Sequence, residues 1–322
     1  MTARARVWLI VAGAAAVAAG LTVGVTVLTS GTPERSTLKP RPGSPPLALD
    51  LGVRIDREAR ALRRAATLYN RGKRAEAGRV FAHYGSLQAR VGLAFSRWPD
   101  GSLSAVERLI RANPGSAFVR LHLGLAYFWA GRGQDALVSW RAAVRVQPDS
   151  ASAVHADDLL HPRFAQGLPV FVPTFAPPGA IAKLSPPRQL AALAAAARRP
   201  DAKAKILYGI ALQRLGKPLS AERQYAAAAR LAADDPEAQT AAGVGLFSKE
   251  KPSLAFSRLG PLAGRFPHAA TVRFHLAVLL LWIGSVNPAR AQFRKAVRDD
   301  PSGPLGREAR RFLERLQGVG SR

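Results

Sequence analysis

A 34-residue spacing of small and bulky apolar residues constrains the fold of this chain more than any other feature. Small residues recur at Gly209, Gly243 and Ala277, and three further series keep the same step and phase: Ala221, Ala255 and Ala289; Tyr225, Leu259 and Phe293; and Ala228, Leu262 and Ala296. Pro267 and Pro301 follow the same step. A period of this length is typical of chains in which one helical unit stacks on the next.

One unit can be followed in full between Ser116 and Ser150. Its order of key residues is Leu123, Gly124, Tyr127, Gly131, Ala136, Trp140, Ala143 and Pro148. This order resembles the tetratricopeptide repeat, a 34-residue pair of antiparallel helices. Gly124 and Ala136 are small where the helices cross, Tyr127 and Trp140 fill the gap, and Pro148 stops the second helix. The resemblance covers most of the chain from about Glu58 to the end.

The resemblance implies an all-α, TPR-like α-solenoid of about seven helix pairs, one of them expanded, ending in a polar-faced capping helix. The expected divisions are repeats 1–3 over residues 49–150, an expanded repeat over 151–201, repeats 5–7 over 202–302, and the cap over 303–322. In the expanded repeat, helices at Ala151–Leu160 and Pro186–Arg199 flank a proline-rich insertion, residues 162–186.

The core of the insertion, Leu168 to Pro178, is too rich in proline for a helix and too apolar for a solvated loop. We expect an extended strip that packs Phe171 and Phe175 against solenoid residues such as Phe128 and Trp129. Such a strip either completes the fold or mimics a ligand that a true partner displaces.

In the family, the first helix of each pair lines the concave face. The matching apolar positions here are the predicted partner groove: Phe118, Leu121, Leu125, Phe128, Trp129, Ile206, Ile210, Val244, Phe247, Phe274, Val278 and Trp282. The polar positions of the same face are Lys203, Gln213, Arg214, Glu237, Thr240, Ser248 and Thr271. An exposed surface of this kind is expected to bind a protein or peptide, unless the superhelix or the inserted strip already covers it. The Lys/Asn/Arg pattern of carboxylate-clamp members is missing.

The N-terminal 29 residues predict a basic stub and a transmembrane helix, because Val7–Thr29 carries no charge and is long enough to cross a bilayer. A cleaved signal peptide and a buried helix are the alternatives. Arg4 and Arg6 place the N-terminus in the cytoplasm, whereas Arg35 and the basic residues after it argue for the reverse. We expect a single-pass protein with its C-terminal domain outside the cytoplasm, and a Pro/Gly/Ser-rich linker over residues 30–48.

The formal charge of +26 predicts attraction to anionic surfaces such as an envelope polymer or lipid head groups. A nucleic-acid partner is not expected, because no recognisable module accompanies the basic residues. The chain lacks cysteine and any Walker loop, HExxH or GxSxG motif, so we expect no enzyme and no cofactor. The cluster His155, Asp157, Asp158 and His161 is interpreted as ordinary polar residues at a helix end, and no metal site is expected.

These observations favour a membrane-anchored interaction scaffold or assembly factor at a bacterial cell envelope, which binds a peptide or protein through the concave face. The alternatives are an envelope protein that binds polyanions through its arginine-rich surface, and an envelope enzyme built on the repeats.

Overall fold

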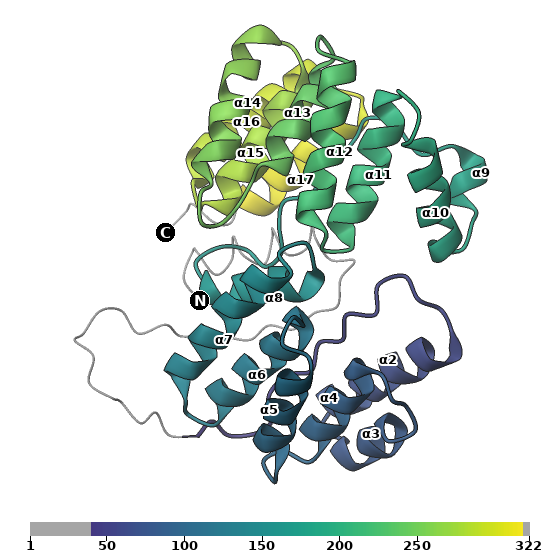
Figure 1. The fold of residues 1–322 in the computed structure, drawn as a ribbon. Helices are drawn as coiled ribbons and strands as arrows, with labels where there is room; N and C mark the ends of the chain where they lie inside the picture. The colour runs from purple at the N-terminus through teal and green to yellow at the C-terminus, as the bar shows by residue number, and fades with distance from the viewer. Residues whose placement is uncertain (1–39, 318–322) are drawn as a thin grey trace. The chain divides into compact units, whose positions relative to one another are not determined.

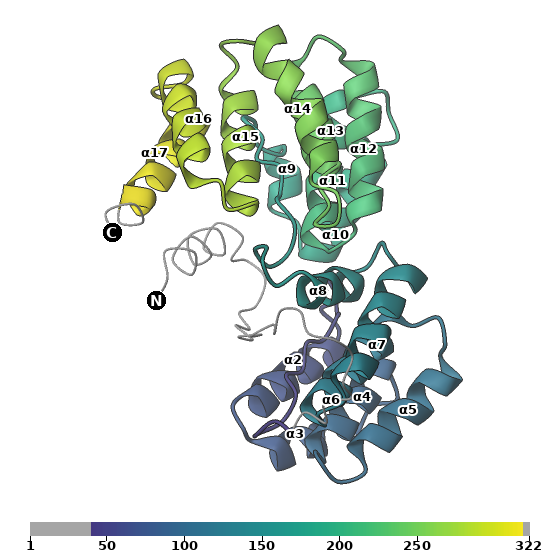
Figure 2. The ribbon, with the colours of Figure 1, turned by 90° about the vertical axis from the view of Figure 1, so that its left-hand side faces the viewer.

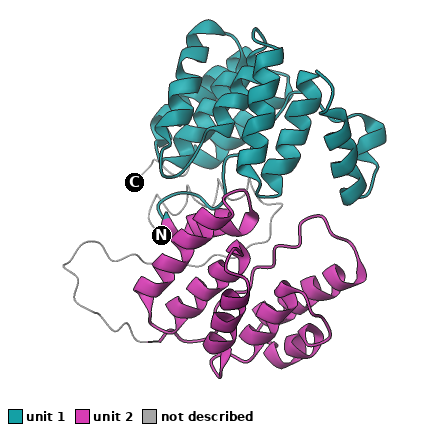
Figure 3. Cartoon of the chain, viewed as in Figure 1, with its two compact units in different colours: residues 1–20, 161–322 teal, residues 21–160 magenta. Residues whose placement is uncertain are grey.

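The computed structural model describes residues 40–317, which form two compact units that meet in sequence between Leu160 and His161 (Figure 3). All regular secondary structure in these residues is helical (Figure 1). The N-terminal unit, residues 40–160, contains α2 (Arg57–Asn70), α3 (Arg74–Phe81), α4 (Leu87–Ser96), α5 (Ser102–Ala112), α6 (Ala117–Trp129), α7 (Gly133–Val146) and α8 (Ala151–Leu160). The C-terminal unit, residues 161–317, contains α9 (Gly179–Ala182), α10 (Pro186–Ala196), α11 (Ala202–Arg214), α12 (Pro218–Leu231), α13 (Pro236–Gly245), α14 (Ser253–Arg265), α15 (Ala270–Trp282), α16 (Val286–Asp299) and α17 (Pro304–Gln317).

Short polar side chains fix where most first helices of the pairs begin. The Asp56, Ser86, Ser116 and Asp201 side chains each accept a hydrogen bond from a backbone N–H in the first turn of the following helix. Asp235 caps α13 in the same way. These bonds satisfy donors that a helix N-terminus leaves unpaired.

The two helices of a pair cross where the sequence provides a glycine. A Cβ atom added to Gly124 would lie 2.3 Å from Nε1 of Trp140, and one added to Gly209 would lie 2.5 Å from Cε1 of Tyr225. Gly243 meets Leu259 in the same way, at 2.6 Å. The predicted repeat register is therefore confirmed, and its small and bulky positions are buried: Ala221, Tyr225, Ala228, Ala255, Leu259, Leu262, Ala289, Phe293 and Ala296.

The first helices of successive pairs are neighbours within each unit. α2, α4 and α6 form one layer of the N-terminal unit, and α11, α13 and α15 form the corresponding layer of the C-terminal unit (Figures 1 and 2). We call the surface of each layer that is turned away from the second helices the first-helix face. It corresponds to the face on which the sequence places the partner groove.

Each unit contains three helix pairs followed by a single closing helix, and the C-terminal unit also contains α9 and α10. α8 packs on α6 and α7, whereas α17 packs on α15 and α16. α10 packs on α11 and belongs to the C-terminal unit. The sequence-based division placed Ala151–Leu160 and Pro186–Arg199 in one expanded repeat, but in the structure these two helices lie in different units. The segment between them has its own packing, which a repeat period cannot indicate.

The predicted single-pass membrane localisation is corrected by the structure. Within residues 40–317, no helix is both long enough and apolar enough to cross a membrane. The stretch Val7–Thr29, on which the prediction rested, lies outside the described residues.

Candidate functional site

An extended segment of the chain lies on the first-helix face of the C-terminal unit. This inserted segment, residues 168–175, precedes α9 and has no regular secondary structure. Pro169 and Phe171 are buried, whereas Val172 and Thr174 are exposed. The predicted extended strip is confirmed in this respect, since an apolar, proline-containing stretch packs on helices of its own array.

Gln213, in the last turn of α11, binds the backbone of the inserted segment with both ends of its amide. Its Oε1 accepts from the N–H of Phe171 at 3.1 Å, and its Nε2 donates to the carbonyl of Pro169 at 3.0 Å. The Tyr225 hydroxyl also donates to Oε1, at 2.8 Å, which fixes the orientation of the amide. Burial raises the pKa of Tyr225 well above its usual value, so the hydroxyl keeps the proton that it donates.

His275, on α15, accepts the next available backbone N–H. Its Nδ1 lies 2.7 Å from the carbonyl of Thr271, and because a carbonyl can only accept, Nδ1 carries the proton. Nε2 is then free to accept from the N–H of Val172, at 2.9 Å. Burial lowers the pKa of His275 to about 4, which keeps the ring neutral and Nε2 unprotonated near pH 7.

Glu237, in the first turn of α13, binds the far end of the inserted segment. One carboxylate oxygen accepts from the backbone N–H of Thr174, and the other accepts from its hydroxyl at 2.7 Å. The three first helices thus each contribute one polar side chain to the same extended segment. These contacts satisfy backbone groups of the segment that no regular secondary structure pairs.

Two aromatic side chains of the inserted segment, Phe171 and Phe175, complete its binding. The ring of Phe171 is fully buried, stacked on His275 at a centroid distance of 4.5 Å and edge-on to Tyr225 at 6.0 Å. The ammonium group of Lys203 lies 5.5 Å from the centroid of the Phe175 ring, within range of a cation–π interaction.

The N-terminal unit shows a second occupied face. Residues 41–50 lie on its first-helix layer, with Pro45, Pro46 and Leu47 buried. The Asn70 amide binds both the N–H and the carbonyl of Leu47, at 3.2 and 3.0 Å, as Gln213 binds the inserted segment. The Tyr69 hydroxyl donates to the carbonyl of Pro45 at 2.7 Å. The expectation of a linker over residues 30–48 does not describe residues 45–47, because composition cannot show which side chains satisfy their backbone.

The start of this segment lies against the two aromatic residues that end α6. The guanidinium of Arg41 lies 4.0 Å from the centroid of Phe128, and its backbone N–H donates to the carbonyl of Trp129 at 2.9 Å. The strip was expected to pack Phe171 and Phe175 on Phe128 and Trp129, and this is wrong, since Phe171 packs on Tyr225 and His275. Which aromatic surface Phe171 packs against depends on the route of the backbone between the helices, and the sequence pattern does not indicate that route.

The predicted groove residues are divided between the two units. Phe118, Leu121, Leu125, Phe128 and Trp129 belong to the N-terminal unit, and the remaining seven belong to the C-terminal unit. All except Phe128 and Trp129 are buried. Their role in binding a partner stays a prediction.

Lys203, Gln213 and Glu237 are among the polar face positions that the sequence predicts, whereas His275 is not. A signal for it was present, because Val119–Leu123 and Val272–Leu276 share the pattern Val-Arg-x-His-Leu, with His122 and His275 as the central residues. Each histidine is buried and bonded through Nδ1 to the carbonyl four residues before it. Nε2 of His122 makes no hydrogen bond of normal geometry within the described residues, although the nearby backbone of Ala48 opposes the lowering of the His122 pKa by burial.

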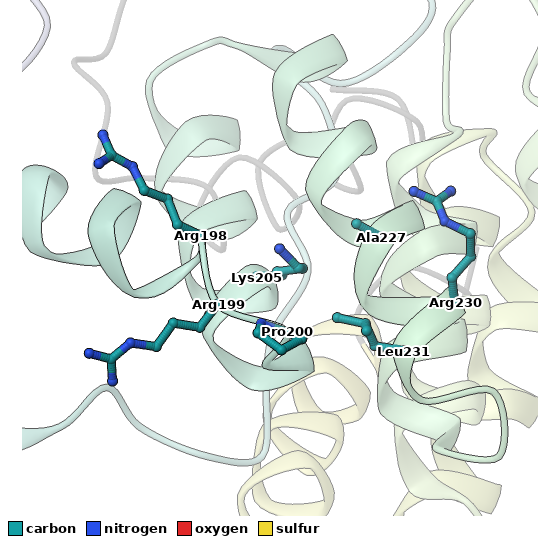
Figure 4. Close-up of a pocket in the computed structure, with 7 residues that line it drawn as sticks. All are labelled: Arg198, Arg199, Pro200, Lys205, Ala227, Arg230 and Leu231. Carbon is teal, nitrogen blue, oxygen red and sulfur yellow. The ribbon is translucent and has the colours of Figure 1, made fainter.

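A shallow basic pocket of about 340 Å³ lies elsewhere on the C-terminal unit, between α10, α11 and α12. Its lining includes Arg198, Arg199, Lys205 and Arg230. Figure 4 shows that the three guanidinium groups point away from one another, and Lys205 donates to the carbonyl of Ala197. This arrangement does not converge on an anion.

Comparisons with known proteins find weak structural similarity to tetratricopeptide repeat proteins. No family model matches the chain, and no characterised protein matches its sequence. Among solved structures, it is similar to YrrB, described as a TPR protein with an unusual peptide-binding site, at 16% identity over 65% of this chain and 99% of that one, with a TM-score of 0.32. A tetratricopeptide repeat protein from Parabacteroides merdae gives 12% identity, 81% and 98% coverage, and a TM-score of 0.35. Yeast Tom70 is 12% identical over 86% of this chain and 67% of that one, with a TM-score of 0.33. With TM-scores below 0.5, these likenesses support no inference about function.

Proposed function

We propose that the chain is a protein-interaction scaffold that binds extended polypeptide segments on the first-helix faces of its two units. The observation that supports this function most directly is the inserted segment itself, held by Gln213, His275 and Glu237. Most of these bonds reach backbone atoms, which every extended polypeptide offers. The face therefore has the chemistry of a peptide-binding surface.

The N-terminal unit supports the same function independently. Asn70 there binds the backbone of Leu47 at both its N–H and its carbonyl, and Tyr69 binds the carbonyl of Pro45. Two units with different sequences thus satisfy an extended, proline-containing segment with the same kind of side chain. Packing alone would not require a paired amide in both places.

The bound segments belong to the same chain, which affects how a partner competes. A tethered segment is present at an effective concentration of the order of millimolar, so a free partner must offer more contacts or a higher local concentration. Burial of one phenylalanine contributes about 1.5–3 kcal/mol. Removing the Phe171 ring should therefore make the face more accessible to a free peptide.

The test uses the full-length chain with Phe171→Ala and a fluorescent peptide of the sequence 166–178. Anisotropy should show saturable binding that is tighter than to the unmodified chain. Adding Gln213→Leu or His275→Phe should weaken it at least tenfold, because each removes bonds to the peptide backbone. His122→Phe, at the matching position of the other unit, is the control and should leave this binding unchanged.

Salt dependence separates this function from binding of polyanions through the basic surface. Binding at the face depends on buried apolar contacts and hydrogen bonds, and it should persist at about 0.5 M salt, where the Debye length is only about 4–5 Å. Absence of saturable binding, or binding that disappears with salt and ignores the Gln213 and His275 variants, would contradict the proposed function.

A further inference from the structure

We infer that the partner of the C-terminal face presents a phenylalanine followed three residues later by a threonine or serine with a free hydroxyl, and that it binds by replacing the inserted segment. This inference rests on the proposed function and specifies the sequence that the face selects. It follows from the register of the inserted segment on α11, α13 and α15.

The positions of the prolines define the register. The face accepts the backbone N–H groups of Phe171, Val172 and Thr174. Pro169 and Pro173 have no backbone N–H. They lie at positions where Gln213, His275 and Glu237 accept no hydrogen bond from the backbone of the segment. A bound partner can carry proline at these two positions, two before and two after the phenylalanine, but not at the three positions that donate.

The phenylalanine position is selected by a closed aromatic pocket. The Phe171 side chain has no exposed surface, and its ring lies between His275 and Tyr225. Both pocket residues also bind elsewhere, His275 to Thr271 and Tyr225 to Gln213, so neither side chain is free to rotate away. Alanine at this position would leave the pocket empty, whereas a polar side chain would be buried without a partner.

The hydroxyl position is selected by Glu237. Its two oxygens accept from the N–H and the hydroxyl of Thr174, an arrangement that only threonine or serine can complete with a short side chain. A carboxylate or phosphate there would meet the Glu237 carboxylate at hydrogen-bond distance, and like charges at such distances repel strongly. The face therefore excludes an acidic or phosphorylated residue at this position.

The inserted segment has features of an exchangeable occupant. Only Pro169 and Phe171 among residues 168–175 are buried, and the exposed Val172 and Thr174 contact the face mainly through backbone or polar atoms. Gln213, Glu237 and His275 are polar side chains that water can satisfy when the segment leaves. Core positions such as Leu259 and Phe293 pack within their own helix pairs, against Gly243 and Phe274 respectively, and these contacts do not involve the segment.

The test measures four peptides against the full-length Phe171→Ala chain by anisotropy: the sequence 166–178, the same peptide with Ala in place of Phe171, with Val in place of Thr174, and with phosphothreonine at 174. Affinity should fall at least tenfold for the alanine peptide and about three- to tenfold for the valine peptide. It should fall further for the phosphothreonine peptide. Circular dichroism of each variant confirms that the helices are intact.

A charge exchange isolates the contact with Glu237. Glu237→Lys in the same background should reverse the order, so that the phosphothreonine peptide binds more tightly than the unmodified one. Equal affinities for all four peptides, or tight phosphothreonine binding with Glu237 unchanged, would overturn the inference while leaving the proposed function in place. Failure of every peptide to bind would instead contradict the proposed function, and with it the inference.

Discussion

The backbone N–H of Val172 donates to Nε2 of His275 at 2.9 Å, and this bond joins the inserted segment to the third helix pair of its unit. This bond forms because the protonated Nδ1 of His275 donates to the carbonyl of Thr271, which leaves Nε2 as an acceptor. A loop residue and a buried histidine, 103 positions apart in sequence, are thereby coupled. The same histidine stacks on Phe171, so it contributes to both the polar and the apolar part of the site.

Replacing this histidine should destabilise the C-terminal unit. His275→Phe keeps an aromatic ring for Phe171 but removes the acceptor of the Val172 N–H, which should cost about 1–3 kcal/mol of unfolding free energy. His122→Phe is the comparison variant, since it loses the same Nδ1 bond to a helix carbonyl, while its Nε2 makes no hydrogen bond of normal geometry within the described residues and only a weaker interaction with the backbone of Ala48. Urea unfolding measures both. Equal losses would mean that the Val172 bond contributes nothing.

Acid should destabilise both units through their histidines. Burial lowers the pKa of His122 and of His275 from 6.5 to about 4, so the unfolded chain binds protons more readily than the folded one. This contribution to stability is complete above pH 6.5 and is lost as the pH falls toward 4, by up to about 3 kcal/mol per histidine. Urea unfolding at pH 7, 5.5 and 4.5 should show the decline, and His275→Phe should flatten it for the C-terminal unit. A pH-independent free energy between 7 and 4.5 would contradict the assignment of neutral histidines.

Adding one methyl group at a helix crossing should disturb the site from a distance. In Gly209→Ala, the new Cβ would lie 2.5 Å from Tyr225, whose hydroxyl orients Gln213, so we expect a loss of about 1–3 kcal/mol and weaker retention of the inserted segment. Gly264→Ala is the control, since nothing lies within 4 Å of its added Cβ, and helix propensity should stabilise it by up to about 1 kcal/mol. Melting temperatures that shift equally in the two variants would refute the predicted packing.

A single negative charge should release the inserted segment without unfolding the helices. Thr174→Glu places a carboxylate against Glu237, and it should increase hydrogen exchange across residues 168–175 at least tenfold. Val172→Glu adds the same charge on an exposed side chain and should change exchange little, because the bond to His275 uses the backbone of Val172. Similar exchange in both variants would show that Glu237 does not hold the segment.

The repeat register could be predicted from sequence because it depends on local size. Position 209 has to be small because Tyr225 packs directly against it. A small residue recurs every 34 residues, so the requirement is visible in the sequence. The extended form of the inserted segment followed in the same way from its prolines, and the burial of Phe171 followed from its apolar character. These features depend on neighbouring residues and on composition.

The partners of both extended segments could not be predicted, since they depend on contacts across long separations. Phe171 was expected on Phe128 and Trp129, yet its ring packs on His275, and Arg41 packs on Phe128 instead. Several aromatic surfaces satisfy the same apolar requirement, so composition cannot choose among them. The choice depends on bonds from side chains to the backbone, such as that from Nε2 of Gln213 to the carbonyl of Pro169, and these leave no periodic pattern in the sequence.

Hydrogen exchange of residues 168–175 in the unmodified, full-length chain, measured as an isotopically labelled peptide of the sequence 166–178 is added, tests the central claim most directly. If the C-terminal face binds extended segments and the inserted segment is its exchangeable occupant, exchange at residues 168–175 should accelerate with peptide concentration and saturate. α11, α13 and α15 should remain protected throughout. If residues 168–175 stay protected even at peptide concentrations well above the roughly millimolar effective concentration of the tethered segment, the inserted segment is a fixed part of the fold and the claim is contradicted.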